Sequence, residues 1–163
     1  MRSPDPAHSA SQARTLSDIA ECGVHVAHVL ADGADDDRDP LFSYTVGLWH
    51  SFEQPEVVVF GLPKEVANDL LDALADDVSE GTRYPAGTRH DGLLQGYPVR
   101  MLEVPAERFA EHFELAAWAY EGEPVPAVQL VYPDKQGRWP WDQTTRVGFR
   151  ECQPVIGARE TPS

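Results

Sequence analysis

The sequence has few cysteines and no long hydrophobic run, and both deficits narrow the classes of protein to which it can belong. Its two cysteines, Cys22 and Cys152, are too few and too far apart in sequence for a zinc or redox motif. No apolar run approaches the roughly 20 residues that a membrane-spanning helix needs. The first residues, MRSPDPAHSASQAR, lack the apolar segment of a secretory signal. We therefore expect a protein in a reduced, cytoplasmic setting, without a membrane partner.

Positive charge is also scarce. The chain of 163 residues has 13 lysines and arginines against 27 aspartates and glutamates, which gives a formal net charge of −14 at pH 7. A surface this negative repels phosphate backbones and anionic lipids, so we expect no nucleic-acid partner. The charge favours solubility, and it makes a basic protein partner easier to accommodate.

Common motifs of nucleotide-binding and hydrolytic enzymes are missing. Neither G-x-G-x-x-G nor G-x-x-x-x-G-K occurs, and G-x-S-x-G and H-E-x-x-H are absent as well. The acidic stretch at residues 32–37 lacks the spacing of an EF-hand, which favours a solvated loop. We therefore expect no cofactor and no metal site of a common class.

Two strand-like runs, Phe42–Leu48 and Glu56–Leu62, are the most strongly patterned part of the sequence. In the first run, large apolar side chains alternate with small residues such as Ser43 and Thr45, which is the period of a strand with one apolar face. The second run is rich in β-branched residues and apolar on both faces, as in a central strand covered from both sides. The connection, residues 49–55, has about the length of a hairpin loop.

The rest of the pattern predicts a single domain over residues 14–142, between a mobile N-terminal tail at 1–13 and a polar C-terminal tail at 143–163. Further strands are expected at residues 24–30, 97–104 and 128–132, main helices after Pro63 and Pro105, and a short helix near residues 15–22. This order predicts an α+β fold: a mixed, mainly antiparallel sheet of about five strands, with two main helices on one face.

The runs FSYTVGLWHSFEQPEVVVFGLP and VQLVYPDKQGRWPWD together resemble a bacterial family, the domain of unknown function 4262 family. The resemblance covers roughly residues 15–142, from the first expected strand to the tryptophan-rich end. It implies one compact α+β domain in a soluble bacterial protein, and it implies no reaction, because no activity is assigned to the family. Gln54 stands where the resemblance leads us to expect histidine in many relatives, so a role for that histidine would not transfer.

His50 follows the end of the first central strand, and Glu53 comes three residues later. An imidazole at a strand end beside a carboxylate is a suitable general base near neutral pH. We therefore take His50 as the candidate catalytic base or acid, Glu53 as the residue that orients it, and Arg100 or Thr45 as the group that polarises a substrate. The alternatives are a partly exposed loop histidine without a catalytic role and an Arg100 paired with a surface acid.

Aromatic residues and small polar residues supply the candidate ligand-binding side chains. The dense R-W-P-W-D segment near the end of the chain either closes the core as a lid or forms a platform for a ligand or peptide. The small face of the first central strand either lets a helix pack closely or leaves room for a ligand. The full set of expected ligand-binding residues is Ser43, Thr45, Trp49, Gln129, Trp139 and Trp141.

These residues predict a pocket for a small molecule or peptide between the His50 connection and the Trp139–Trp141 segment. If the pocket is catalytic, the expected chemistry is cofactor-independent acid–base catalysis. One alternative is a non-catalytic interaction or regulatory module whose aromatic residues contact a basic partner. The other is a metal-dependent enzyme, although His25 and His28 would point to opposite faces of a strand and could not share an ion.

Overall fold

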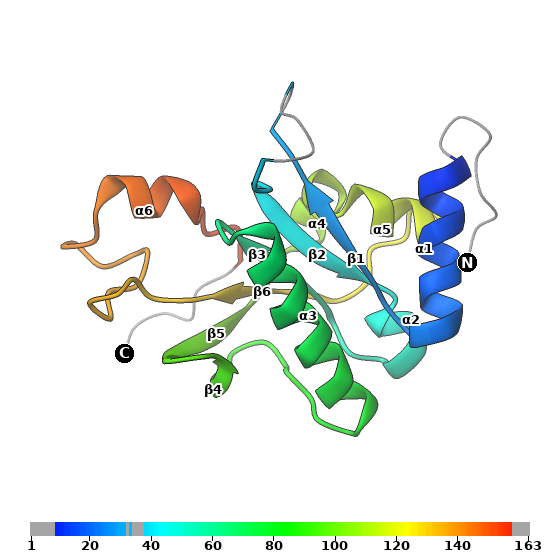
Figure 1. The fold of residues 1–163 in the computed structure, drawn as a ribbon, viewed down its shortest axis with the longest axis horizontal. Helices are drawn as coiled ribbons and strands as arrows, with labels where there is room; N and C mark the ends of the chain where they lie inside the picture. Colours follow the sequence, from blue (N-terminus) through cyan, green and yellow to red (C-terminus); the bar gives the residue numbers. More distant parts are fainter. Residues whose placement is uncertain (1–8, 32, 34–37, 158–163) are drawn as a thin grey trace.

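The computed structural model describes residues 9–31, 33 and 38–157 (Figure 1). Residues 1–8 of the expected N-terminal tail, and all of the acidic stretch except Gly33, lie outside the described residues. Residues 9–13 belong to the first helix, α1 (Ser9–Cys22). None of the helices in this part of the chain has both the length and the apolar character to cross a membrane.

The described residues form a six-stranded sheet in the order β1-β2-β3-β6-β5-β4 (Figure 1). The strands are β1 (His25–Val29), β2 (Phe42–Val46), β3 (Glu56–Phe60), β4 (Arg89–Leu94), β5 (Tyr97–Glu103) and β6 (Ala127–Val131). Only the β3–β6 pair among these neighbours is parallel. The predicted α+β class and mixed, mainly antiparallel sheet are confirmed. The additional strand is β4, which the turn-rich sequence before Tyr97 forms as a hairpin with β5.

The two central strands pair as predicted, with Phe42 opposite Phe60. Their connection is a short helix, α2 (Leu48–Phe52), where the sequence predicts a simple hairpin loop. Gly47 precedes α2 with a φ of 116°, and a Cβ atom there would approach the Gly23 carbonyl oxygen to 2.8 Å. Glycine is therefore required where α2 meets the chain between α1 and β1.

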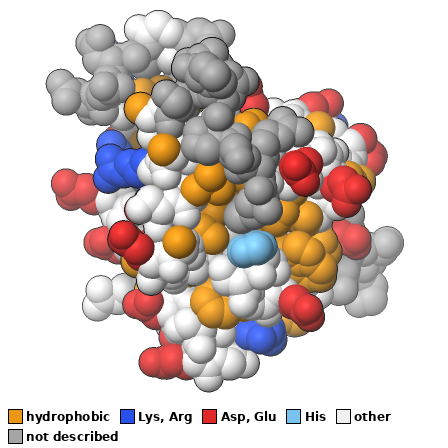
Figure 2. Space-filling view, turned by 90° about the vertical axis from the view of Figure 1, so that its right-hand side faces the viewer, with side chains coloured by type: hydrophobic (Ala, Val, Ile, Leu, Met, Phe, Trp, Pro, Cys, Tyr) orange, Lys and Arg blue, Asp and Glu red, His pale blue; other side chains and the backbone are white. Residues whose placement is uncertain are grey.

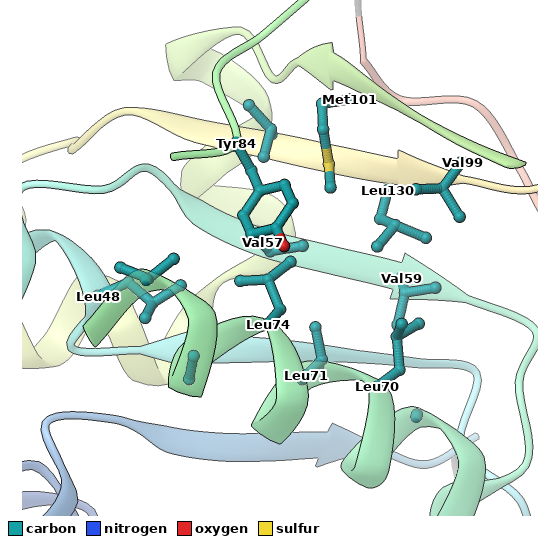
Figure 3. Packing of buried hydrophobic residues seen from close by; sticks show 14 of the residues in the cluster. Leu48, Val57, Val59, Leu70, Leu71, Leu74, Tyr84, Val99, Met101 and Leu130 are labelled. Carbon is teal, nitrogen blue, oxygen red and sulfur yellow. The ribbon is translucent and has the colours of Figure 1, made fainter. Parts of the chain in front are cut away.

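Helix α3 (Lys64–Ser79) covers one face of the sheet. Figure 3 shows its leucines pointing at the sheet, with Leu74 toward Val57 and Leu70 toward Val59 of β3. The buried side chains of α3 are Ala67, Leu70, Leu71, Leu74, Ala75 and Val78. Ser43 and Thr45 lie on this face of β2, because the intervening Tyr44 belongs to the opposite core. Their small side chains therefore face the side that α3 covers, which agrees with close helix packing.

Helices α4 (Ala106–His112) and α5 (Glu114–Ala119) cover the opposite face (Figure 1). The sequence predicts one helix here, but the chain breaks at Phe113, whose ring stacks on that of Phe109 with centroids 5.0 Å apart. The expectation of helices on one face only is therefore wrong. The reason is visible in β3, where Val58 and Phe60 are buried on the α4–α5 side and need cover as much as the valines facing α3.

The segment after residue 142, where the sequence predicts a polar tail, contains α6 (Val147–Cys152) and further buried groups. The fully buried side chain of Gln153 accepts a hydrogen bond from the backbone N–H of Tyr132 at 2.9 Å and donates to its carbonyl at 2.8 Å. Gln129 of β6 similarly accepts the N–H groups of Ile156 and Gly157. Two glutamine side chains thus bind residues 153–157 to the end of the sheet.

Replacing Gln153 with alanine should leave the N–H and C=O of Tyr132 buried without partners. We expect the free energy of unfolding to fall by about 2–4 kcal/mol, because each buried unsatisfied group costs roughly 1–3 kcal/mol. Urea denaturation measures this loss. The exposed Glu151→Ala variant on the same segment is the control and should change stability by less than about 0.5 kcal/mol. Equal stability of the two variants would show that residues 147–157 add nothing to the fold.

Candidate functional site

Glu56, the first residue of β3, organises the end of the sheet at which α2 lies. Its side chain is fully buried. Its two oxygens accept hydrogen bonds from the Thr45 hydroxyl at 2.8 Å, the Tyr120 hydroxyl at 2.5 Å, and the backbone N–H groups of Gly47 at 2.9 Å, Leu48 at 3.1 Å and Trp49 at 3.4 Å. The carboxylate therefore satisfies the free N–H groups at the start of α2, a helix too short to be stable alone.

Burial also changes the pKa values of Glu56 and Tyr120. Burial raises the pKa of Glu56, and the hydrogen bonds from Tyr120 and Thr45 oppose that rise because they favour the charged form. Burial, together with the charge of Glu56, raises the pKa of Tyr120. The phenol therefore stays protonated and remains a donor to Glu56 across the neutral pH range.

A pocket with a volume of about 370 Å³, which we call the α2 pocket, opens beside Glu56 and Tyr120. Its described lining residues are Trp49, His50, Glu53, Tyr120, Glu123 and Val125. Tyr120 connects the pocket to the interior, because its hydroxyl donates to Glu56 and accepts the backbone N–H of His50 at 3.2 Å. The pocket combines aromatic rings, an imidazole and two carboxylates, with no lysine or arginine among these residues.

Backbone strain marks the same place. Among the described residues, Glu53 with a φ of 55° and Glu121 with a φ of 58° are the two non-glycine residues with positive φ. Glu53 ends α2 and lines the pocket, and Glu121 directly follows Tyr120. The left-handed conformation costs a residue such as glutamate roughly 1–2 kcal/mol. Strain of this kind concentrates at functional sites, so these two residues point to the pocket independently of its shape.

The pocket contains one half of the predicted site. Trp49, His50 and Glu53 come together in it, as expected from their closeness in sequence. Within the described chain, however, no hydrogen bond or ion pair joins the side chains of His50 and Glu53. The predicted role of Glu53 in orienting His50 is therefore not supported, and the imidazole is exposed.

The other half of the predicted site lies at the opposite end of the sheet. Strand β6 begins opposite Glu56 and ends opposite Arg100. The guanidinium of Arg100 lies over the ring of Trp139, which stacks on Trp141. The prediction of a single pocket between His50 and these tryptophans is therefore wrong, because the length of β6 separates them (Figure 1).

Three predicted ligand-binding residues have internal roles instead. The hydroxyl of Ser43 is hydrogen-bonded to Nδ1 of His28 at 2.7 Å, and that of Thr45 donates to Glu56. Gln129 binds the backbone of residues 154–157. All three side chains are buried, so Thr45 positions Glu56 and does not polarise a substrate.

A larger depression, with a volume of about 1540 Å³, runs along the edge strand β1 between α1, α3 and α5. Figure 2 looks onto the α1 side of the molecule, where hydrophobic side chains lie between carboxylates near the margins. Some polar groups in the depression already bind other protein groups, as His25 does with Asp18 at 2.8 Å and His28 with Ser43. The depression therefore combines apolar surface with polar groups, some of which already have partners within the protein.

Metal binding has no support in this geometry. In the part of the chain that the structure describes, no three histidine, cysteine, aspartate or glutamate side chains converge on a point that could hold an ion. His25 and His28 bind different partners, Asp18 and Ser43, as expected for side chains on opposite faces of a strand.

Sequence reasoning missed Glu56 and Tyr120. Glu56 did carry a signal, because a carboxylate at the start of an otherwise apolar, buried strand must find partners. Tyr120 carried none, since it lies 64 residues further along the chain and only the fold brings it to Glu56.

Comparison with known families agrees with the pattern of the sequence. A family model described as a domain of unknown function, number 4262, matches residues 18–146. No curated protein and no solved structure matches the chain. The family match confirms the resemblance carried by the central strands and the tryptophan-rich segment.

Replacing Tyr120 with phenylalanine should destabilise the protein in a pH-dependent way. Because burial places the folded-state pKa of Glu56 above its unfolded value, Glu56 contributes less stability as pH rises through that window. Loss of the Tyr120 hydrogen bond raises the folded-state pKa further and widens the window. The variant should therefore be less stable by about 1.5–3 kcal/mol near pH 8, with the deficit shrinking toward about pH 4, where Glu56 is protonated in both proteins.

Urea denaturation at several pH values measures this difference. Tyr97→Phe is a matched control, because Tyr97 is half-buried and its hydroxyl has no hydrogen-bond partner among the described residues. A Tyr120→Phe deficit that stays constant across the pH range would mean that Tyr120 acts through packing and not through Glu56.

Proposed function

The chain belongs to the domain of unknown function 4262 family, and we propose that its α2 pocket binds a cationic group. The group is an amine or guanidinium, carried by a small molecule or by a basic peptide. The observation that carries the proposal is the combination of the Trp49 and Tyr120 rings with the carboxylates of Glu53 and Glu123 in one pocket. Aromatic rings attract cations through their quadrupole, and carboxylates add charge-assisted hydrogen bonds.

The surrounding charge supports a cation over an anion. The buried carboxyl group of Glu56 lies directly behind Tyr120, and in its ionised form it adds a negative charge that solvent screens poorly. The net charge of −14 raises the local concentration of cations around the whole protein. A basic partner would therefore be attracted at long range and held at the pocket by short-range contacts.

The state of the titratable groups favours binding over acid–base catalysis. The Tyr120 hydroxyl already donates to Glu56 and accepts from His50, and its raised pKa makes it a poor base at neutral pH. His50 has no carboxylate partner in the described chain that would fix its tautomer. A binding module, in which His50 supplies one more ring, requires none of these groups to transfer a proton.

Titration with small cations tests the proposal. Tetramethylammonium and N-acetyl-lysine methylamide should shift the ¹H–¹⁵N NMR signals of Trp49, His50 and Glu123 with dissociation constants on the order of 1 mM, since each partly exposed contact contributes roughly 0.5–1 kcal/mol. Sodium acetate at the same ionic strength should leave these signals in place. Equal shifts with acetate, or no saturable shift with either cation, would contradict a cation-binding pocket.

Paired carboxylate variants locate the binding. Glu53→Gln and Glu123→Gln should each weaken binding of N-acetyl-lysine methylamide by about threefold, because a partly exposed charge pair is worth up to roughly 1 kcal/mol. Glu107→Gln, at an exposed position of α4, removes one charge from a different element and should have no comparable effect. An equal loss in all three variants would mean that net charge, and not the pocket, holds the cation.

Glu53→Gly should increase the stability of the protein and weaken its binding of a cation. Glycine adopts a φ of 55° without strain and is the residue preferred after a helix C-terminus, so thermal unfolding should show a gain of about 1 kcal/mol. The same variant should bind N-acetyl-lysine methylamide more weakly, since a pocket carboxylate is lost. Glu121→Gly relieves the same strain outside the pocket lining and should gain stability without losing affinity. A Glu53→Gly protein less stable than wild type would contradict the strain argument.

A further inference from the structure

Two like-charged side chains face each other at the end of the sheet far from the α2 pocket. Arg89 of β4 and Arg100 of β5 are direct register partners in an antiparallel pair. Directly opposed residues share one face of a sheet with Cβ atoms roughly 4.5–5.5 Å apart, and like charges in that position are destabilising. Both side chains are exposed. A chain with 27 carboxylates against 13 cations would more simply place an acid at one of the two positions.

Arg100 points away from the core beneath α3. Its neighbours Val99 and Met101 are fully buried in that core, and side chains alternate along a strand. The guanidinium carbon of Arg100 lies 5.3 Å from the centroid of the Trp139 ring. Trp139 in turn stacks on Trp141, with centroids 5.5 Å apart and ring planes inclined by 2°. Arg100 therefore rests on a stack of two indole rings.

The hydrogen-bonding edges of these two arginines are not engaged, unlike those of neighbouring Arg138. Arg138 donates to the Asp134 carboxylate at 3.0 Å and to the Thr144 carbonyl at 3.0 Å. Within residues 9–31, 33 and 38–157, neither Arg89 nor Arg100 has a side-chain hydrogen bond or an ion pair. A guanidinium held over a ring by cation–π attraction can still donate its N–H groups to an oxyanion.

The loop that carries the tryptophans is fixed by its own hydrogen bonds. The backbone N–H of Trp139 donates to the Asp142 carboxylate at 2.8 Å, and the Thr145 hydroxyl donates to the Trp139 carbonyl at 2.5 Å. The bonds of Arg138 to Asp134 close the same loop. The indole beneath Arg100 is thus held in position, which reduces the entropy lost when a ligand binds the guanidinium.

We propose that Arg89 and Arg100, supported by Trp139, form a binding site for a doubly charged oxyanion, with a phosphate monoester as the best-fitting class. Two arginines at directly opposed positions of neighbouring strands can direct paired N–H donors to one tetrahedral phosphoryl group. A dianion offsets the repulsion between both arginines, whereas a single carboxylate offsets only half of it. This site is separate from the α2 pocket, and neither depends on the other.

The net charge of −14 limits the kinds of anion that this site can bind. Long-range repulsion discourages anions in general from approaching the protein. Binding must therefore come from short-range, bidentate contacts, and these distinguish a phosphoryl dianion from chloride or acetate. The ligand is expected to be a small phosphorylated molecule, since a nucleic acid would bring many phosphates against the negative surface.

Titration with inorganic phosphate and with phenyl phosphate at about pH 8 tests the site. The ¹H–¹⁵N signals of the Arg89 and Arg100 side chains and of the Trp139 indole should shift saturably, with dissociation constants on the order of 1 mM. Phenyl phosphate binding more tightly than inorganic phosphate would identify a monoester site, and equal binding would identify a site for the phosphoryl group alone. Acetate or chloride producing the same shifts at equal ionic strength would overturn the proposal.

Variants give a second readout. Arg100→Lys keeps the charge but loses the fork and the stacking, and Arg89→Gln removes half of the pair, so each should weaken phosphate binding about tenfold. Arg14→Gln, at an exposed position of α1, is the matched control and should bind as wild type does. Without phosphate, Arg89→Gln should raise the melting temperature by about 1–3 °C, because the opposed charges are gone. Undiminished phosphate binding in both site variants would overturn the proposal.

Discussion

One buried charge determines how this end of the molecule is assembled. A carboxylate in the protein interior is tolerated only where hydrogen-bond donors replace the water that it has lost. For Glu56 these donors come from β2 through Thr45, from the start of α2 through Gly47, and from the end of α5 through Tyr120. The four segments therefore cannot move independently. The pocket beside Tyr120 keeps its form because a displaced donor would leave the carboxylate without a partner.

The elements that could be predicted from sequence are those in which the spacing of apolar residues shows which side chains are buried. The central pair β2–β3 and helix α3 follow from a period of two, a β-branched run and a helical apolar stripe. Helix α2 could not be predicted this way, because five residues are too few to show a period and the partner that stabilises them is Glu56. The structure of the segment after residue 142 could not be predicted for a related reason. Gln129 and Gln153 use polar side chains where a strand would use its backbone, so composition alone suggests a tail.

The candidate site could be predicted only where its residues are close in sequence. Trp49, His50 and Glu53 lie on one short segment, so their meeting follows from local structure. Arg100 and Trp139 also meet, but which end of the sheet they occupy depends on the direction of β6. That strand runs parallel to β3, so its far end carries them away from the α2 pocket. The residue types indicated candidate binding groups, but no local pattern in the sequence predicts the sheet topology that separates them.

The two proposed sites share one physical character. Almost all buried polar side chains in the described residues are satisfied, with the Trp118 indole nitrogen as the one buried side-chain atom there without a partner. Against that background, two glutamates with positive φ lie at one end of the sheet and two directly opposed arginines at the other. Each arrangement is locally unfavourable, and a simple substitution would relieve it. Locally unfavourable arrangements in an otherwise consistent structure are expected at residues that serve to bind a ligand. The residues concerned are negatively charged at one end of the sheet and positively charged at the other. The carboxylates of Glu53 and Glu123 and the guanidiniums of Arg89 and Arg100 thus make the two ends complementary to opposite kinds of ligand.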